Sequence, residues 1–297
     1  MTSGVLRASA PAKLNLYLHV TGRRADGYHL LDSLVAFAGI ADTVEVAPSR
    51  DLALEIDGPF ASALGAESAT DNIVMRAARR LASAAGIDAK AAIRLTKRLP
   101  VAAGIGGGSS DAAAVLRLLR RLWAIDLPQA VMDALALELG ADVPVCGFAR
   151  AAFVGGIGEE IVAAPALPPA AVLLVNPLRP LPTNAVFALR RGDYSAPGRF
   201  SESPRDAKAL ASILRERRND LTAAASDRMP EIAAIIAAIG RTDGCLLARM
   251  SGSGATCFGL FATMDEAQAA AVAAKSDHSG WWIEAAPLLT DIRGEGR

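Results

Sequence analysis

The sequence predicts a fold that mixes α-helices and β-strands in two domains. Segments with the alternating pattern of strands and segments with the helical period follow one another along most of the 297 residues. At residues 165–169 both patterns give way to prolines and alanines, which is typical of a domain boundary. We therefore expect one domain over residues 1–164 and a second over residues 165–297.

Composition excludes several classes of protein. The chain is 52% hydrophobic and 21% charged, which is typical of a soluble globular protein. Its 31 basic residues balance 31 acidic ones, so no overall charge would attract nucleic acid or an anionic membrane. The three cysteines are far apart and form no Cys-x-x-Cys pair, which argues against a disulfide framework or a zinc site. No signal pattern or membrane-length apolar run is evident, so we expect a cytoplasmic protein.

Residues 10–20 alternate strictly between apolar and polar side chains, which predicts a strand with one face in the core. Lysine is scarce in this arginine-rich chain, so a lysine among these apolar residues calls for a reason. The polar face is equally a solvated surface or one side of a site. Its members are Lys13, Asn15, Tyr17 and His19.

The next segment, residues 22–29, is a turn-rich loop. Tyr28 and His29 offer a stacking surface beside a hydrogen-bonding edge, a combination that suits a nucleobase. An exposed hairpin loop is the alternative.

Residues 43–46 and 52–56 alternate as scaffold strands. Asp71 is then expected to cap a helix that ends at Gly86. Asn72, in the first turn of that helix, either starts the helix or contacts a ligand.

A glycine-rich stretch follows a short strand at residues 91–95 and Lys97. The amides of Gly106, Gly107 and Gly108 can turn toward one point, which suits an anion. Ser109 and Ser110 are expected to cap the amphipathic helix that follows, whose N-terminus would add its dipole. A flexible loop capped by serine is the weaker alternative.

Another helix is predicted from Pro128 to Leu139, with Gly140 as its end. Asp142 follows, where we expect no helix dipole to stabilise it and no N-cap role. It is equally a turn residue or a catalytic base. Residues 153–162 then read as a hairpin with a glycine turn.

The second half continues the alternation and contains a second loop of small residues, 250–256. Two such loops could hold the phosphates of a nucleotide from two sides. Strands are expected at residues 171–175, 245–249, 257–261 and 281–285, and helices at 205–217, 220–228, 230–239 and 265–275.

Phosphate binding without a redox motif points to phosphoryl transfer, but the common signatures are missing from the sequence. No lysine follows a glycine, so there is no P-loop, and the protein-kinase motifs His-Arg-Asp and Asp-Phe-Gly are absent. The dinucleotide fingerprint also fails, because Ser109 stands where a glycine or alanine is needed.

The joint pattern instead resembles the superfamily of galactokinase, homoserine kinase, mevalonate kinase and phosphomevalonate kinase. Within it, the match narrows to the 4-diphosphocytidyl-2-C-methyl-D-erythritol kinase family of the non-mevalonate isoprenoid pathway. The resemblance covers residues 8–261. It is carried by APAKLNL (10–16), DGYH (26–29), GGGSS (106–110), LGADVP (139–144) and MSGSGAT (250–256).

The resemblance implies an α+β fold in two domains, with the active site in the cleft between them. The N-terminal domain would be similar to ribosomal protein S5 domain 2, and the C-terminal domain would be ferredoxin-like. The activity implied is transfer of the γ-phosphoryl group of ATP to the substrate's 2-hydroxyl.

The same resemblance implies roles for particular residues. Lys13 matches the family's active-site lysine, and Asp142 matches the general base. The substrate-binding positions would be Asn15, Tyr28, His29, Thr183, Phe187, Gly252 and Ser253. The ATP-binding positions would be Asn72, Lys97, Pro100, Gly104, Gly106, Gly107, Gly108, Ser109 and Ser110.

Ala102 departs from the family, which often has glycine there, and we expect a modest effect on the entry to the loop. Phosphoryl transfer implies Mg²⁺, although no ligands for it can be identified. We expect small-molecule substrates only and a monomer or weak homodimer. The alternatives are a sister kinase of the superfamily with a mevalonate-type or sugar substrate, or a catalytically silent nucleotide-binding regulator.

Overall fold

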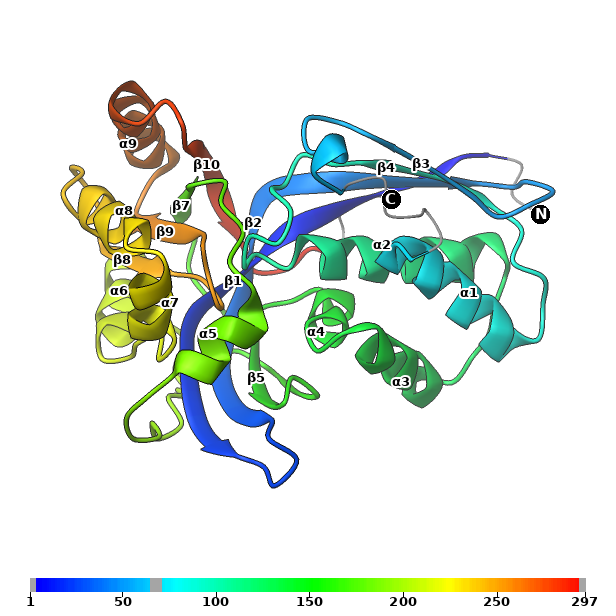
Figure 1. The fold of residues 1–297 in the computed structure, drawn as a ribbon, viewed down its shortest axis with the longest axis horizontal. Coiled ribbons are helices and arrows are strands. Elements are labelled where there is room, and N and C mark those ends of the chain that lie inside the picture. The colour runs from blue at the N-terminus through cyan, green and yellow to red at the C-terminus, as the bar shows by residue number, and fades with distance from the viewer. Residues whose placement is uncertain (1–3, 65–70, 294–297) are drawn as a thin grey trace.

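The computed structural model describes residues 4–64 and 71–293. Within them, ten strands form one connected sheet in the order β3-β4-β2-β10-β7-β9-β8, with β1 and β5 also beside β2, and β6 beside β5. Figure 1 shows helices α1 to α4 on one side of the molecule and α6 to α9 on the other, with the long strands β1 and β2 running between them. This mixed fold confirms the predicted α+β class. The first and last residues of the two predicted domains, 1–3 and 294–297, lie outside the described residues.

Two long antiparallel strands, β1 (Leu6–Arg23) and β2 (His29–Ala47), form the hairpin at the centre of the molecule. The alternating pattern predicted the strand correctly but left its polar face open. Residues 12–20 are buried throughout, because protein packs on both faces. The polar side chains of that face are therefore enclosed.

The helices of the N-terminal half pack against this sheet and form a core with its strands. Asn72, and not Asp71, caps the first helix, because its Oδ1 accepts the Val74 N–H at 2.9 Å. The second helix begins at Gly107, so Ser109 and Ser110 lie inside its first turn and do not cap it. The elements are β3 (Ala53–Asp57), the 3₁₀ turn Ala61–Leu64, α1 (Ile73–Ala85), β4 (Ala92–Thr96), α2 (Gly107–Leu122), α3 (Gln129–Leu139), α4 (Val143–Phe148), β5 (Ala152–Gly156) and β6 (Glu160–Ala163).

The C-terminal strands pair in the order β10-β7-β9-β8, and every pair is antiparallel. Counted along the chain this order is fourth, first, third, second, which is the ferredoxin-like arrangement expected. Two short helices, α4 and α5, had no counterpart in the sequence patterns, because prolines surround their starts. The elements are β7 (Ala171–Asn176), α5 (Thr183–Leu189), α6 (Ala207–Arg215), α7 (Thr222–Arg228), α8 (Glu231–Gly240), β8 (Leu247–Met250), β9 (Cys257–Phe261), α9 (Met264–Asp277) and β10 (Trp282–Leu289).

The last strand joins the two halves. β10 pairs with β7 along most of its length, and its end pairs with β2 through Leu288 and Leu289. The chain then continues along the N-terminal half, where the Ala151 N–H donates to the carbonyl of Thr290 and Ile292 enters the core. A division of the chain between residues 164 and 165 stays a prediction. In the described part of the chain, no helix is long and apolar enough to cross a membrane.

Candidate active site

A cleft of about 1420 Å³ lies where the two halves of the molecule meet. Its lining comes from β1, the β1–β2 turn, the glycine-rich loop before α2, the start of α4, helix α5 and the loop 250–256. Every predicted site residue lines this cleft except Ser110. Residues from widely separated motifs are therefore brought into one cavity.

Lys13 and Asp142 form an ion pair inside the cleft, with Lys13 Nζ 2.9 Å from Asp142 Oδ2. The Lys13 side chain is 3% exposed and that of Asp142 is 44% exposed, so the carboxylate is the accessible partner. Asp142 does precede a helix, the short α4, but its side chain makes no capping hydrogen bond. The expectation that no helix dipole lies beside Asp142 was wrong, whereas the missing capping hydrogen bond agrees with the expectation of no N-cap role.

Lys13 is also fixed from two other sides. Its Nζ donates to Asn15 Oδ1 at 2.8 Å, and its backbone N–H donates to the Ile105 carbonyl of the glycine-rich loop at 2.8 Å. Asn15 Nδ2 donates to Ser33 Oγ at 2.7 Å, which sets the orientation of the amide. These contacts leave the ammonium group little freedom to move, so it is preorganised opposite Asp142.

The glycine-rich loop leads into α2 with backbone angles that favour glycine. Gly106 is the residue before the helix, has φ of 62° and offers no side chain to cap it. The N–H groups of the first turn, from Gly107 to Ser109, thus have no intrahelical acceptor, and these residues line the cleft, a geometry that suits an anion. Ala102 also has a left-handed φ, 52°, which costs an alanine about 1 kcal/mol more than a glycine.

Ser110 lies behind this loop and not in it. Its N–H donates to the Gly106 carbonyl at 2.8 Å, and its buried hydroxyl donates to the Pro11 carbonyl at 2.7 Å. The hydroxyl therefore ties α2 to β1 and is not available to a ligand in the cleft.

The two loops of small residues touch each other. A Cβ added at Gly104 would lie 2.3 Å from the carbonyl oxygen of Gly254. Ser251 bridges the same contact, because its hydroxyl accepts the Asn15 N–H at 3.1 Å and donates to the Gly104 carbonyl at 3.2 Å. The second loop therefore supports the first.

Lys97 lines the cleft, but its ammonium group is already paired with two buried carboxylates. Its Nζ donates to Asp42 and, at 2.7 Å, to Asp111. Asp42 also accepts the N–H groups of Arg98 and Leu99, at 2.5 and 2.9 Å, and so holds the chain that leads into the glycine-rich loop. Burial raises the pKa of Asp111 to about 7, and the Lys97 ammonium opposes this shift. Sequence reasoning missed both aspartates. Asp111 was the easier to find, because it follows the paired serines directly.

At the other end of the cleft, aromatic side chains from two elements meet. The rings of His29, at the start of β2, and Phe187, on α5, are stacked with centroids 5.2 Å apart. Tyr28 lies beside them with 62% of its surface exposed. Burial, and next the positive charges of Arg23 and Arg190, lower the pKa of His29, so the ring is neutral at pH 7.

Helix α5 is also tied to the second loop. Thr183 Oγ1 lies 2.9 Å from Ser253 Oγ, and Gly252 completes this wall of the cleft. Asn72 and Pro100 line the opposite end, near the first turn of α2.

Comparisons with known proteins identify the family. The GHMP kinases N terminal domain matches residues 72–150, and the GHMP kinases C terminal domain matches residues 188–279. A protein of Paramagnetospirillum magneticum named 4-diphosphocytidyl-2-C-methyl-D-erythritol kinase is 55% identical over 95% of this chain and 98% of its own length. A protein of the same name from Paracoccus denitrificans is 53% identical over 95% of this chain and 96% of its own.

Solved structures are similar to this chain over nearly its whole length. A crystal structure of 4-(cytidine 5'-diphospho)-2C-methyl-D-erythritol kinase matches with a TM-score of 0.77 and 34% identity, over 95% of this chain and 99% of that one. Homoserine kinase from Cytophaga hutchinsonii matches with a TM-score of 0.73 at 17% identity, over 99% and 97% of the two chains, and shares the fold.

Proposed function

Because the chain belongs to the 4-diphosphocytidyl-2-C-methyl-D-erythritol kinase family of the GHMP kinases, we propose that it transfers the γ-phosphoryl group of ATP to the 2-hydroxyl of that substrate. It is a small-molecule kinase. The observation that carries the assignment of its site is the Lys13–Asp142 pair, which lies in the cleft between an anion-binding helix N-terminus and an aromatic pocket.

Asp142 is the general base in this proposal. Its carboxylate is accessible from the cleft and can accept the proton of the attacking hydroxyl within hydrogen-bond distance. The proton moves to Asp142 as the oxygen bonds to phosphorus and the bond to the leaving oxygen of ADP breaks.

Lys13 has two tasks. Its ammonium, 2.9 Å from Asp142 Oδ2, holds the carboxylate in position in the cleft. It also stabilises the negative charge of the transferring group, and its fixed position means that no reorganisation is needed during the reaction.

The first turn of α2 would hold the phosphates of ATP. The N–H groups from Gly107 to Ser109 donate to phosphate oxygens, and the positive end of the helix dipole adds to the attraction. Asn72, Pro100 and Lys97 would line the adenosine end of the same site.

Mg²⁺ is expected to arrive with ATP, and the cleft offers oxygen donors of the kind it prefers. Ser109, in the first turn of α2, lines the cleft and would supply a hydroxyl oxygen, with phosphates and water as the other ligands. When bound, the ion neutralises phosphate charge.

The cytidine end would bind beside His29, Tyr28 and Phe187. Aromatic rings stack on a pyrimidine base, and a neutral imidazole presents both a donor and an acceptor to its edge. Asn15 and Thr183 would contact the erythritol portion of the substrate, between the cytosine ring and Asp142.

The test incubates the purified chain with ATP, Mg²⁺ and 4-diphosphocytidyl-2-C-methyl-D-erythritol, and follows ADP release together with the phosphorus spectrum of the product. Parallel reactions contain mevalonate, homoserine or galactose as the acceptor. We expect turnover with the cytidine substrate alone. ADP release only with another acceptor would favour a sister kinase, and no release with any acceptor would favour a silent nucleotide-binding protein.

A further inference from the structure

An extended segment, residues 191–200, connects α5 with α6 and lies along the outer edge of β1. We call it the strap. The Ser195 N–H donates to the Val20 carbonyl at 2.9 Å. Farther along the same edge, the Leu18 N–H donates to the Arg218 carbonyl at 3.0 Å, and the Asp220 N–H donates to the Leu18 carbonyl at 2.9 Å. Two segments of the C-terminal half therefore cover an edge that β1 would otherwise leave unpaired.

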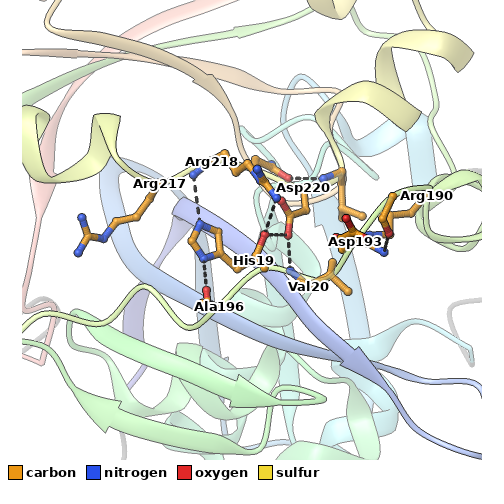
Figure 2. Close-up of polar contacts among 12 residues, drawn as sticks. His19, Val20, Arg190, Asp193, Ala196, Arg217, Arg218 and Asp220 are labelled. Atoms are coloured by element: carbon orange, nitrogen blue, oxygen red, sulfur yellow. Dashed lines mark hydrogen bonds and ion pairs between the residues drawn. The ribbon is translucent and has the colours of Figure 1, made fainter.

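His19 lies between these two segments and is only 7% exposed (Figure 2). Its Nδ1 is 2.8 Å from the Ala196 carbonyl oxygen, and its Nε2 is 3.2 Å from the Arg218 backbone nitrogen. A carbonyl can only accept and an N–H can only donate, so Nδ1 must carry the proton and Nε2 must accept. His19 is thus held as one neutral tautomer, which joins the strap to the loop before α7.

Two arginines and two aspartates make further tethers of the strap. Arg217 Nε donates to the Gly198 carbonyl at 2.6 Å, and Arg218 Nη2 donates to Ser195 Oγ at 2.9 Å. Asp220 Oδ2 accepts the Ser195 hydroxyl at 2.7 Å and the Val20 N–H at 2.8 Å. Asp32 accepts the Gly198 N–H and Arg199 Nε, both at 2.7 Å. The strap is therefore attached to β1 and to β2 at successive positions.

Helix α5, which carries Thr183 and Phe187, leads directly into the strap. Arg190, just after α5, donates from Nη1 to the Gly192 carbonyl at 2.7 Å and from Nη2 to the Asp193 carbonyl. Figure 2 shows this turn close to Val20 and Asp220. The chain between α5 and the tethers is thus compact, so a shift of the strap moves the end of α5.

We propose that the strap fixes the distance between Phe187 on α5 and His29 on the hairpin, and that His19, through its bond to Ala196, is a positioning residue for the cytidine end of the substrate. This rests on the function proposed above. The β1–β2 hairpin supplies one wall of the aromatic pocket and α5 supplies the other. The tethers join those walls outside the pocket, in addition to the Thr183–Ser253 contact that holds the start of α5.

Substitutions at His19 can separate its two bonds. An asparagine amide reaches the place of Nδ1 and can still donate to Ala196, whereas a glutamine amide reaches the place of Nε2 and can still accept from Arg218. We expect His19→Asn to keep a KM for the cytidine substrate within about twofold of wild type. His19→Gln and His19→Phe should raise it about tenfold, with the KM for ATP unchanged and kcat within about twofold.

Ser195→Ala removes the side-chain tethers to Asp220 and Arg218 and should raise the same KM by a smaller factor, adding to the effect of His19→Gln in the double variant. It also tests the strap if His19→Phe fails to fold. His278→Phe is the matched control, because that histidine stacks on Trp281 at 3.7 Å, away from the residues that line the cleft. Equal effects of the Asn and Gln variants, or equal rises in both KM values, would overturn the proposal.

Amide hydrogen exchange of residues 183–189 supplies a readout that needs no substrate. Faster exchange there in His19→Gln than in His19→Asn supports the strap, and identical exchange in the two contradicts it. If the wild-type chain does not phosphorylate the cytidine substrate, the function proposed above fails, while the exchange result still decides whether the strap holds α5.

Discussion

Lys13 Nζ lies 2.9 Å from Asp142 Oδ2, and the two side chains differ sharply in exposure, 3% against 44%. The buried ammonium is fixed by Asn15 and by the backbone of the glycine-rich loop, while the carboxylate extends into the cleft. A fixed cation beside an accessible base is the arrangement that phosphoryl transfer to an alcohol needs. The predictions below concern this pair and the groups around it.

Asp142→Asn should lower kcat by about 10²–10⁴-fold, because an amide cannot accept the hydroxyl proton. ATP binding should be unchanged, since the helix N-terminus that would hold the phosphates is untouched. Steady-state kinetics and ATP titration calorimetry measure the two effects. Asp133→Asn, an exposed aspartate on α3, is the control. Turnover of Asp142→Asn near the wild-type level would refute the role of the base.

Gly104→Ala should raise the KM for ATP at least tenfold. The new Cβ would meet the Gly254 carbonyl oxygen at 2.3 Å, so one of the two loops must move. Gly86→Ala is a matched control, because Gly86 has a similar φ of 66° but nothing within 4 Å of an added Cβ. The control should lose about 1 kcal/mol of unfolding free energy and keep its KM. A normal KM for ATP in Gly104→Ala would show that the loop contact is unimportant.

Tyr28→Ala should raise the KM for the cytidine substrate about tenfold, as expected when one stacking face is lost. Tyr28→Phe keeps the ring and should stay within about threefold of wild type. Since Tyr28 is 62% exposed, neither change should alter the free energy of unfolding by more than about 0.5 kcal/mol. A rise in the KM for ATP without a rise in the KM for the cytidine substrate would contradict the placement of the cytosine ring beside Tyr28.

The KM for the cytidine substrate should be flat from about pH 7 upward and should rise in acid. Burial and two nearby arginines lower the pKa of His29 below its ordinary value of about 6.5, so the ring stays neutral until the pH falls below that value. Protonation of His29 then replaces a hydrogen-bond acceptor with a donor at the edge of the imidazole that would face the cytosine ring. In His29→Gln, whose side chain cannot titrate, the rise of the KM at acid pH should disappear. If the rise is unchanged in that variant, another group causes it.

Asp111 should make the protein less stable as the pH rises from about 4 to about 7. Burial raises its folded pKa to about 7, whereas an unfolded aspartate titrates near 3.9. Between these values the folded state binds more protons than the unfolded state, so unfolding free energy falls with rising pH. Asp111→Asn, which resembles the protonated form, should lose less stability than wild type between pH 5 and pH 8. Equal losses in denaturant titrations of the two proteins would contradict the shifted pKa.

Much of the local structure could be predicted from the chain alone. The alternation at residues 10–20 identified the strand that carries Lys13, and glycine placement identified the loop before α2 and the end of α1 at Gly86. These features depend on neighbours in the sequence, so periodicity and backbone preference reveal them. The helix starts were less certain. Asp71 and Asn72 are both good caps, and only the fold selected Asn72.

Lys97 shows where sequence reasoning about the site stopped. The family resemblance placed Lys97 among the ATP-binding positions. In the fold, its ammonium group forms buried ion pairs with Asp42 and Asp111. Ser110 is similar, because its hydroxyl is used by the Pro11 carbonyl. Asp42, Asp111 and Pro11 all lie far from these residues in the sequence, so no local pattern predicted the contacts.

The sequence by itself determined most of the strands and helices, the two glycine loops and the family, because motif spacing and periodicity are local properties of the chain. Tertiary structure decided which polar groups meet. It buried both faces of β1, set Asp142 opposite Lys13, and placed the strap against His19. The physical reason is that burial and long-range hydrogen bonds arise only when distant segments pack together, and packing fixes a side chain's partners and its charge.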